Sequence, residues 1–124
     1  MSFIEFESWE IKSGDEEAHH QMIRDWFNFV RDHHQALFAE WKSARYFRQL
    51  SKEGEPNGSY IMMFEFHTLD GFNAYKTRRD GFTGPYEAYK KVDPYQFFVD
   101  RSVKISYLEP QNEDLWFKFN NGGR

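Results

Sequence analysis

The longest regular pattern of apolar positions lies between about residues 15 and 38. Apolar and aromatic residues recur there at spacings of three and four, as on one side of an α-helix, and neither Pro nor Gly interrupts the segment. Ser13 and Glu16 can cap the amino end. The pattern predicts one long amphipathic helix. Its apolar stripe consists of Ala18, Met22, Trp26, Phe29, Val30, His33 and Leu37.

Four segments rich in β-branched and aromatic residues are predicted to be strands. They span residues 3–11, 43–50, 60–67 and 103–108. A polar turn with Gly and Pro, residues 51–58, joins the second to the third and predicts a hairpin. Residues 115–119 are predicted to form a short fifth strand.

Further helices are predicted between the third and fourth strands. Thr68 or Asp70 can cap a helix over residues 69–79. Glycines after it end that helix, and Pro85 begins a short helix to about residue 92. Asp93 and Pro94 begin another helical stretch. Residues 76–91 hold five Lys or Arg and two acids, a basic patch that is either a solvated helix face or a contact for an anionic ligand.

The order of these elements predicts an α+β, ferredoxin-like βαββαβ fold with extra short helices before the last strand. A right-handed crossover through the long helix should bring the first strand to a parallel neighbour. The helices cover one sheet face. Because the third strand is apolar on both faces, we expect the other face to pack on a second copy. Residues 1–119 should form one domain, and residues 120–124 a flexible tail.

Composition favours an aromatic core. Phe, Tyr and Trp make up 20 % of the 124 residues, whereas Leu, Ile and Val together number 14. The absence of Cys excludes disulfides, thiolate metal sites and a Cys nucleophile. A net charge of −4 and a pI near 5.7 argue against nucleic-acid binding. The sequence has neither a long apolar run nor a signal-like amino terminus, so we expect a cytoplasmic protein that does not enter membranes.

Two segments resemble the dimeric α+β barrel superfamily. Residues 9–17 resemble its first strand-to-helix junction, and residues 60–75 resemble its third strand and second helix. The resemblance covers about residues 3–110. It implies a homodimer, but the superfamily includes antibiotic-biosynthesis-type monooxygenases without metal or flavin, haem-degrading enzymes, lactone isomerases, stress-responsive proteins and ligand-binding domains of regulators. Function therefore stays open. Haem-degrading members carry an axial His on the second helix, which residues 69–79 lack.

Five polar residues are candidates for catalysis. Glu65 and His67 share a face of the third strand, and Tyr46 and Arg48 share a face of the second. If the helices cover those faces, these residues and His33 converge on a pocket between sheet and helices. An imidazole beside a carboxylate can transfer protons. The alternative is that Glu65 and Arg48 form a cross-strand ion pair and His67 ends the strand.

The remaining histidines do not indicate a metal site. His19 and His20 lie in the first turns of the long helix, where we expect them at the surface. His33 and His34 diverge by about 100° on a helix. No pair stands four residues apart, so no metal site and no cofactor are predicted.

Six aromatic residues are predicted either to fill the core or to line a pocket. They are Trp26, Phe29, Phe64, Phe66, Phe72 and Tyr75. Aromatic clefts suit small planar molecules. The resembling monooxygenases act on phenolic polycycles that reduce oxygen with their own electrons. That resemblance implies His33 or His67 as base and Tyr46 or Arg48 as oxyanion partner. A non-enzymatic ligand-binding or stress-related module, and a purely structural dimer, are the alternatives.

Overall fold

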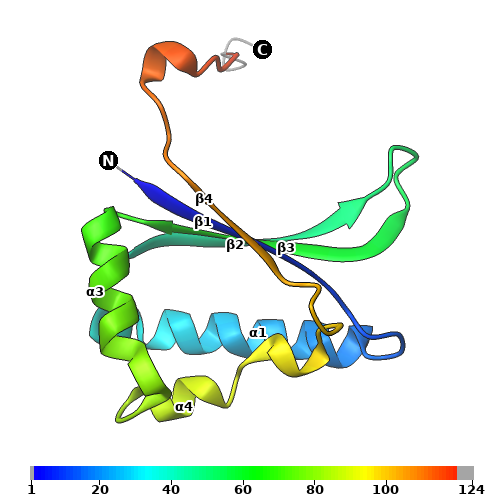
Figure 1. Cartoon of the computed structure of the whole chain (residues 1–124), viewed down its shortest axis with the longest axis horizontal. Helices are drawn as coiled ribbons and strands as arrows, with labels where there is room; N and C mark the ends of the chain where they lie inside the picture. The colour runs from blue at the N-terminus through cyan, green and yellow to red at the C-terminus, as the bar shows by residue number, and fades with distance from the viewer. Residues whose placement is uncertain (1, 120–124) are drawn as a thin grey trace.

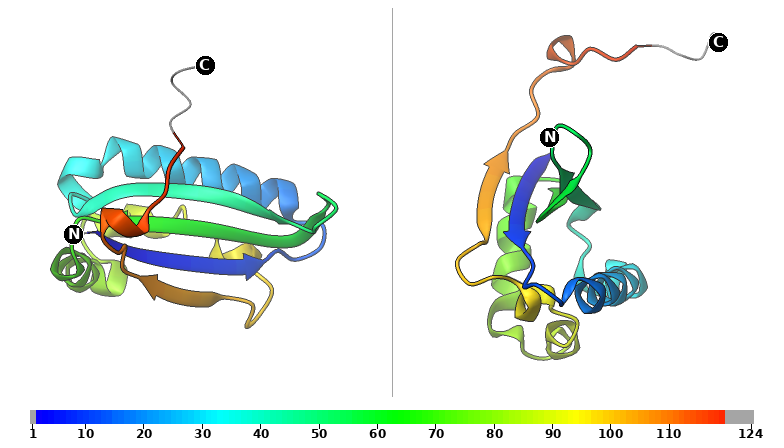
Figure 2. Two further views of the ribbon diagram at one scale, coloured as in Figure 1. Left: turned by 90° about the horizontal axis from the view of Figure 1, so that it is seen from above. Right: turned by 90° about the vertical axis from the view of Figure 1, so that its right-hand side faces the viewer.

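The computed structural model describes residues 2–119, so the predicted tail at 120–124 lies outside the described residues. Four strands form one antiparallel sheet in the order β2-β3-β1-β4 (Figures 1 and 2). This is the strand order of the predicted ferredoxin-like fold. The strands are β1 (Phe3–Glu10), β2 (Trp41–Leu50), β3 (Pro56–Phe66) and β4 (Lys104–Leu108).

The helices between the strands cover one face of the sheet (Figure 1). The α-helices are α1 (Glu16–Asp32), α2 (His34–Leu37), α3 (Leu69–Arg79) and α4 (Tyr86–Lys90). Three short 3-10 helices are η1 (Asp80–Phe82), η2 (Pro94–Phe97) and η3 (Glu113–Leu115). Thr68 caps α3 by accepting a hydrogen bond from the backbone N–H of Gly71, and α3 has the predicted bounds.

As the predicted ferredoxin-like fold requires, β3 lies between β1 and β2, and these two strands are parallel without pairing. Three sequence-based expectations are wrong. The long helix is divided at His33, whose backbone angles of −116° and 16° separate α1 from α2. The cap of α1 is Asp15 rather than Ser13. The predicted fifth strand, residues 115–119, is not a strand, because it has no neighbouring strand to pair with.

The register determines which side chains of the sheet face the helices. On β1, Glu5 and Glu7 pair with Phe64 and Met62 of β3, and these residues point to the covered face. Trp9, two residues further on, is also buried there. The alternate residues of the strands face the opposite, uncovered side. They include Ile4, Phe6, Phe47, Ile61, Met63 and Leu108.

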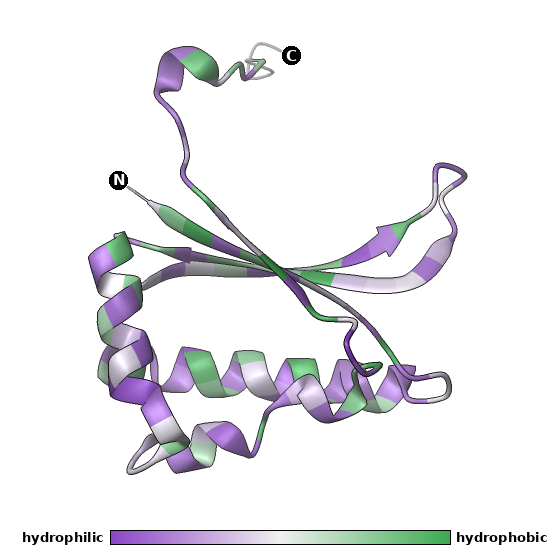
Figure 3. Cartoon of the chain, viewed as in Figure 1, coloured by the Kyte–Doolittle hydropathy of each residue, from purple (hydrophilic) through white to green (hydrophobic). Residues whose placement is uncertain are grey.

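The segment after β4 leaves the sheet on the uncovered side (Figures 1 and 2). Its large apolar side chains are almost fully exposed, with Trp116 at 69 % and Phe117 at 80 %. Figure 3 shows hydrophobic residues both in β1 and in this segment. One copy of the chain thus leaves apolar groups of the sheet and of its C-terminal segment uncovered on the same side.

A polar cluster fixes the helical layer to the start of β2. Arg78 of α3 donates two hydrogen bonds to the Glu40 carboxylate, at 2.6 and 2.8 Å. It also donates to the hydroxyl of Tyr86 in α4, and that buried hydroxyl donates to the carbonyl of Leu37. The cluster therefore joins α2, α3 and α4.

We predict that Tyr86→Phe destabilises the protein by about 1–3 kcal/mol, because it removes a buried donor and leaves its partners incompletely satisfied. Urea unfolding measures the change. Tyr107→Phe is the matched control, since Tyr107 is 53 % exposed and should change stability by less than about 0.5 kcal/mol. Equal effects of the two substitutions would contradict a structural role for the cluster.

Candidate functional site: a cavity between sheet and helices

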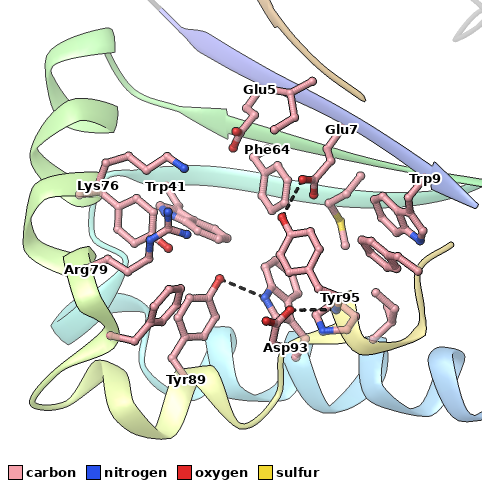
Figure 4. Close-up of a pocket in the computed structure, with 18 residues that line it drawn as sticks. Glu5, Glu7, Trp9, Trp41, Phe64, Lys76, Arg79, Tyr89, Asp93 and Tyr95 are labelled. Atoms are coloured by element: carbon pink, nitrogen blue, oxygen red, sulfur yellow. Dashed lines mark hydrogen bonds between the residues drawn. The ribbon is translucent and has the colours of Figure 1, made fainter. Parts of the chain in front are cut away.

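A cavity of about 330 Å³ lies between the covered face of the sheet and the helical layer (Figure 4). Strands β1, β2 and β3 form one wall, and α1, α3 and the segment from η1 to η2 form the others. This volume falls in the lower part of the range found for small-molecule sites, about 300–1,000 Å³. The cavity is therefore large enough for a compact organic molecule.

Aromatic residues make up half of those that line the cavity. The rings of Trp26 and Trp41 lie 5.6 Å apart, and Phe64 lies 5.8 and 5.5 Å from them, edge to face in both cases. The indole N–H of Trp26 donates to the hydroxyl of Tyr89 at 3.1 Å, which fixes both rings. Such a wall presents flat apolar surfaces to a bound molecule.

Two neighbouring carboxyl groups of β1 point into the cavity. Glu5 is 8 % exposed and Glu7 is 5 % exposed. The Glu7 carboxylate accepts a 2.6 Å hydrogen bond from the hydroxyl of Tyr95. Burial raises the pKa of both Glu5 and Glu7, and their mutual repulsion raises the pKa of Glu7 further. Both groups are thus easier to protonate than ordinary surface carboxylates.

Two cationic groups of α3 line the same cavity (Figure 4). Lys76 and Arg79 are three residues apart and so lie on one side of the helix. Within residues 2–119, neither side chain forms a salt bridge. The Arg79 guanidinium lies 5.2 Å from the centres of the Tyr75 and Phe82 rings. Burial lowers the pKa of Lys76, and the charge of Arg79 acts in the same direction.

Two further polar atoms near this end of the cavity have no hydrogen-bond partner in the described part of the chain. They are the indole nitrogen of Trp41 and the hydroxyl of Tyr75, and both residues line the cavity. Burial raises the pKa of Tyr75 far above its ordinary value, so its hydroxyl keeps its proton. Buried polar groups without partners are rare in proteins and call for an explanation.

The structure divides the six predicted pocket residues into two groups. Trp26, Phe64 and Tyr75 line the cavity. The other three pack elsewhere in the core. Phe66 and Phe72 lie edge to face at 4.9 Å, and Phe29 lies against His33 at 4.3 Å.

None of the five predicted catalytic residues lines this cavity, and the expected convergence is wrong. Glu65 points to the uncovered face, where it accepts a hydrogen bond from Ser43 and pairs with Lys42 at 3.6 Å. His67 follows β3 and is exposed, and His33 lies at the far end of α1. The alternative ion pair is also wrong, because Arg48 pairs with Tyr60 in the register and thus faces the covered side.

Tyr46, also on the covered face, belongs to a buried hydrogen-bonded cluster. The indole N–H of Trp9 donates to Nε2 of His19 at 3.2 Å. The hydroxyl of Tyr46 lies 3.4 Å from Nδ1 of His19 and 3.2 Å from Nδ1 of His20. Nε2 of His20 lies 3.4 Å from the hydroxyl of Tyr60. Neutral imidazoles with suitable tautomers can satisfy every contact in this chain.

The surface position expected for His19 is wrong, because its side chain is fully buried. The first turns of α1 pack beneath Trp9, Tyr60 and Phe98. Burial lowers the pKa of His19 to about 4, and the neighbouring His20 adds to the effect. His19 is therefore neutral at ordinary pH.

Glu5, Glu7, Lys76 and Arg79 were not predicted from the sequence as individual site residues. The basic patch at 76–91 did contain Lys76 and Arg79. For β1, the alternation of Glu with aromatic residues showed that Glu5 and Glu7 share a face. It could not show that this face is the covered one, since Ile4 and Phe6 on the other face are more apolar.

Among the described residues, no group of three or more His, Asp or Glu side chains is placed to hold a metal ion. Within the same part of the chain, no helix is both long and apolar enough to span a bilayer.

Solved structures share this fold at low sequence identity. A candidate antibiotic biosynthesis monooxygenase from Bordetella bronchiseptica aligns with a TM-score of 0.60 at 11 % identity, over 90 % of this chain and 98 % of that one. SnoaB, a cofactor-independent oxygenase from Streptomyces nogalater, solved as a point mutant, aligns with a TM-score of 0.58 at 7 % identity, over 90 % and 94 %.

A third similar structure is a dimeric ferredoxin-like protein of unknown function from Jannaschia sp., with a TM-score of 0.58 at 11 % identity, over 89 % of this chain and 100 % of that one. No protein-family model and no curated protein sequence matches the chain. The predicted α+β, ferredoxin-like fold is thus confirmed. At these identities the likeness does not extend to an activity.

We predict that the contribution of His19 to stability falls as the pH is lowered from about 6.5 towards 4. In this range the unfolded chain binds a proton at His19 that the folded protein excludes. The His19 contribution is complete above pH 6.5 and decreases by up to about 3 kcal/mol, since one pKa unit corresponds to about 1.4 kcal/mol. Urea unfolding of wild type and His19→Gln across this range measures it. Parallel pH profiles for the two proteins would contradict the assignment.

Proposed function

We propose that this protein binds a small aromatic or apolar molecule in the cavity between sheet and helices. The observation that carries the proposal is the cavity of about 330 Å³ with its wall of aromatic rings. Sites for small organic molecules combine such apolar walls with a few polar groups that fix orientation. Here Glu5, Glu7, Lys76 and Arg79 are those groups.

We predict that anthrone, a planar tricyclic molecule, quenches the fluorescence of the cavity tryptophans. Ile23→Trp, which adds volume at the α1 wall, should weaken binding at least about 10-fold, because added bulk competes with the ligand for space. Leu50→Trp is the matched control, since Leu50 is exposed at the end of β2 and does not line the cavity. Equal affinities of both variants, or no quenching, would contradict the proposal.

A second candidate function is oxygenation of the bound molecule without a cofactor. Glu5 favours it, because a buried carboxyl group with a raised pKa and no hydrogen-bond partner among the described residues can accept a substrate proton. In the reaction, a methylene group between two aromatic rings becomes a carbonyl. The substrate supplies all the electrons, one oxygen atom of O₂ enters the product, and the other leaves as water with the two hydrogens.

We predict that the protein accelerates oxygen uptake by anthrones and that Glu5→Gln reduces the rate about 100-fold, a typical contribution of a general base. Glu53→Gln, in the exposed turn before β3, is the control and should retain the wild-type rate. The same electrode assay tests the predicted roles of His33 and His67. A loss in His67→Ala together with a normal rate in Glu5→Gln would place the base outside the cavity.

We also propose that two copies pair through the uncovered face of the sheet. Ile4, Phe6, Ile61 and Met63 form an apolar strip across β1 and β3 on that face, and the similar Jannaschia protein is dimeric. Burying apolar surface of this kind is the usual driving force of association. A tight face-to-face arrangement would also bring the exposed C-terminal apolar side chains towards the second copy.

Sedimentation equilibrium should therefore give twice the chain mass of 15.0 kDa. Met63→Arg should shift the protein towards monomers, because a charge in the middle of the strip is costly to bury. Lys104→Arg, at the margin of the face, should leave the dimer intact. A wild-type monomer at micromolar concentration would exclude this mode of association.

A further inference from the structure

One end of the cavity holds more hydrogen-bond donors than the protein uses. Lys76 and Arg79 project from α3 without a salt bridge in residues 2–119. The indole N–H of Trp41 has no partner there either, and the hydroxyl of Tyr75 makes no well-formed hydrogen bond there, although the Tyr89 hydroxyl and the Arg79 guanidinium are its polar neighbours. The Trp41 and Tyr75 rings lie 5.3 Å apart and nearly perpendicular, and Arg79 lies over Tyr75. These groups therefore form one local cluster.

Three carboxyl groups, those of Glu5, Glu7 and Asp93, line the same cavity, but none of them accepts a hydrogen bond from the cluster. The Glu7 carboxylate is engaged by the hydroxyl of Tyr95. The Asp93 carboxylate accepts the backbone N–H of Tyr95 and caps η2. Only the Glu5 carboxyl, which has no hydrogen bond in the described chain, remains to face two cations. With all three carboxyl groups ionised, the lining carries one more negative than positive charge, so the distinguishing feature of this end is its unpartnered donors rather than an excess of positive charge.

We propose that this end of the cavity is an anion subsite that binds the carboxylate of a planar aromatic acid. Its four donors are Lys76, Arg79, Trp41 and Tyr75. The inference rests on the proposed function, the binding of a small aromatic molecule, and specifies the chemical class of that molecule. The basic patch at residues 76–91 contributes the two cations that reach the cavity.

A carboxylate fits these donors better than other head groups do. It has two oxygens that can accept several hydrogen bonds at once, and a guanidinium matches its planar geometry. The aromatic body of the ligand then lies against Trp26, Phe64 and Tyr89. A cationic amine could pair with a carboxylate of the cavity but would leave the indole and phenol donors unpartnered.

Three ligands of similar size test the subsite by isothermal titration calorimetry at pH 7. They are 2-naphthoate, the neutral 2-acetylnaphthalene and the cationic 2-naphthylmethylamine. We expect 2-naphthoate to bind at least about 10-fold more tightly than the other two, because charge-assisted hydrogen bonds to a carboxylate are stronger than hydrogen bonds to a neutral carbonyl group. A fourth ligand, 2-naphthol, distinguishes a carboxylate from a phenolic oxygen.

Substitutions in the subsite should affect the acid selectively. Arg79→Gln and Tyr75→Phe should each weaken binding of 2-naphthoate about 10-fold and weaken binding of 2-acetylnaphthalene much less, because each removes one donor to the carboxylate. Lys91→Gln removes an exposed cation of the same basic patch that does not line the cavity, and should change neither affinity. Thermal unfolding of each variant verifies that the fold is retained.

The outcomes separate the subsite from the proposed function. Equal affinities for the acid and the neutral ligand, unaltered by Arg79→Gln and Tyr75→Phe, would overturn the subsite while ligand binding stands. Tightest binding of the amine, or of 2-naphthol, would overturn the assignment of a carboxylate. If none of the four ligands binds, both the subsite and the binding of small aromatic molecules are wrong.

Discussion

Two carboxyl groups on the covered face of a central strand shape the interior of this protein. Glu5 and Glu7 stand where a ferredoxin-like sheet would normally bury apolar side chains, between Phe3 and Trp9 on β1. Removing carboxylates from water without partners is costly, so the helical layer does not pack directly on this part of the strand. Tyr95 reaches Glu7 from η2, and the space beside Glu5 stays open as the cavity.

The aromatic residues allow the rest of the layer to remain well packed around that opening. Phe38, Trp41, Tyr75 and Tyr89 form a continuous set of ring contacts that connects α2, β2, α3 and α4. Large rings span the distance between sheet and helices that shorter aliphatic side chains would leave empty. The high aromatic content thus serves both the stability of the core and the flat walls of the cavity.

Capping residues, glycines and apolar periodicity predicted the helices and strands. The site, in contrast, depends on contacts between segments that are distant in the sequence. The cap at Thr68 and the glycines after Arg79 define α3, and the order of elements gives the fold. Strand alternation shows that Glu5 and Glu7 share a face but not which face is covered, and the same ambiguity misplaced Glu65. His19 looked like a surface residue because its burial comes from Trp9 and Phe98, distant in sequence. No Pro or Gly stands at His33, where the helix divides, so the residue pattern could not predict the division.

The strand order also determines when the cavity can form during synthesis. β1 emerges first from the ribosome, but its two neighbours are β3 and β4, and β4 is the last strand of the sheet. Pairings between such distant segments are slow to form because a long loop must close first. Until Lys104–Leu108 has been made, β1 has an open edge that can pair with other chains, and Ile105 is missing from the cavity wall. A nascent or truncated chain is therefore more exposed to aggregation than the finished protein.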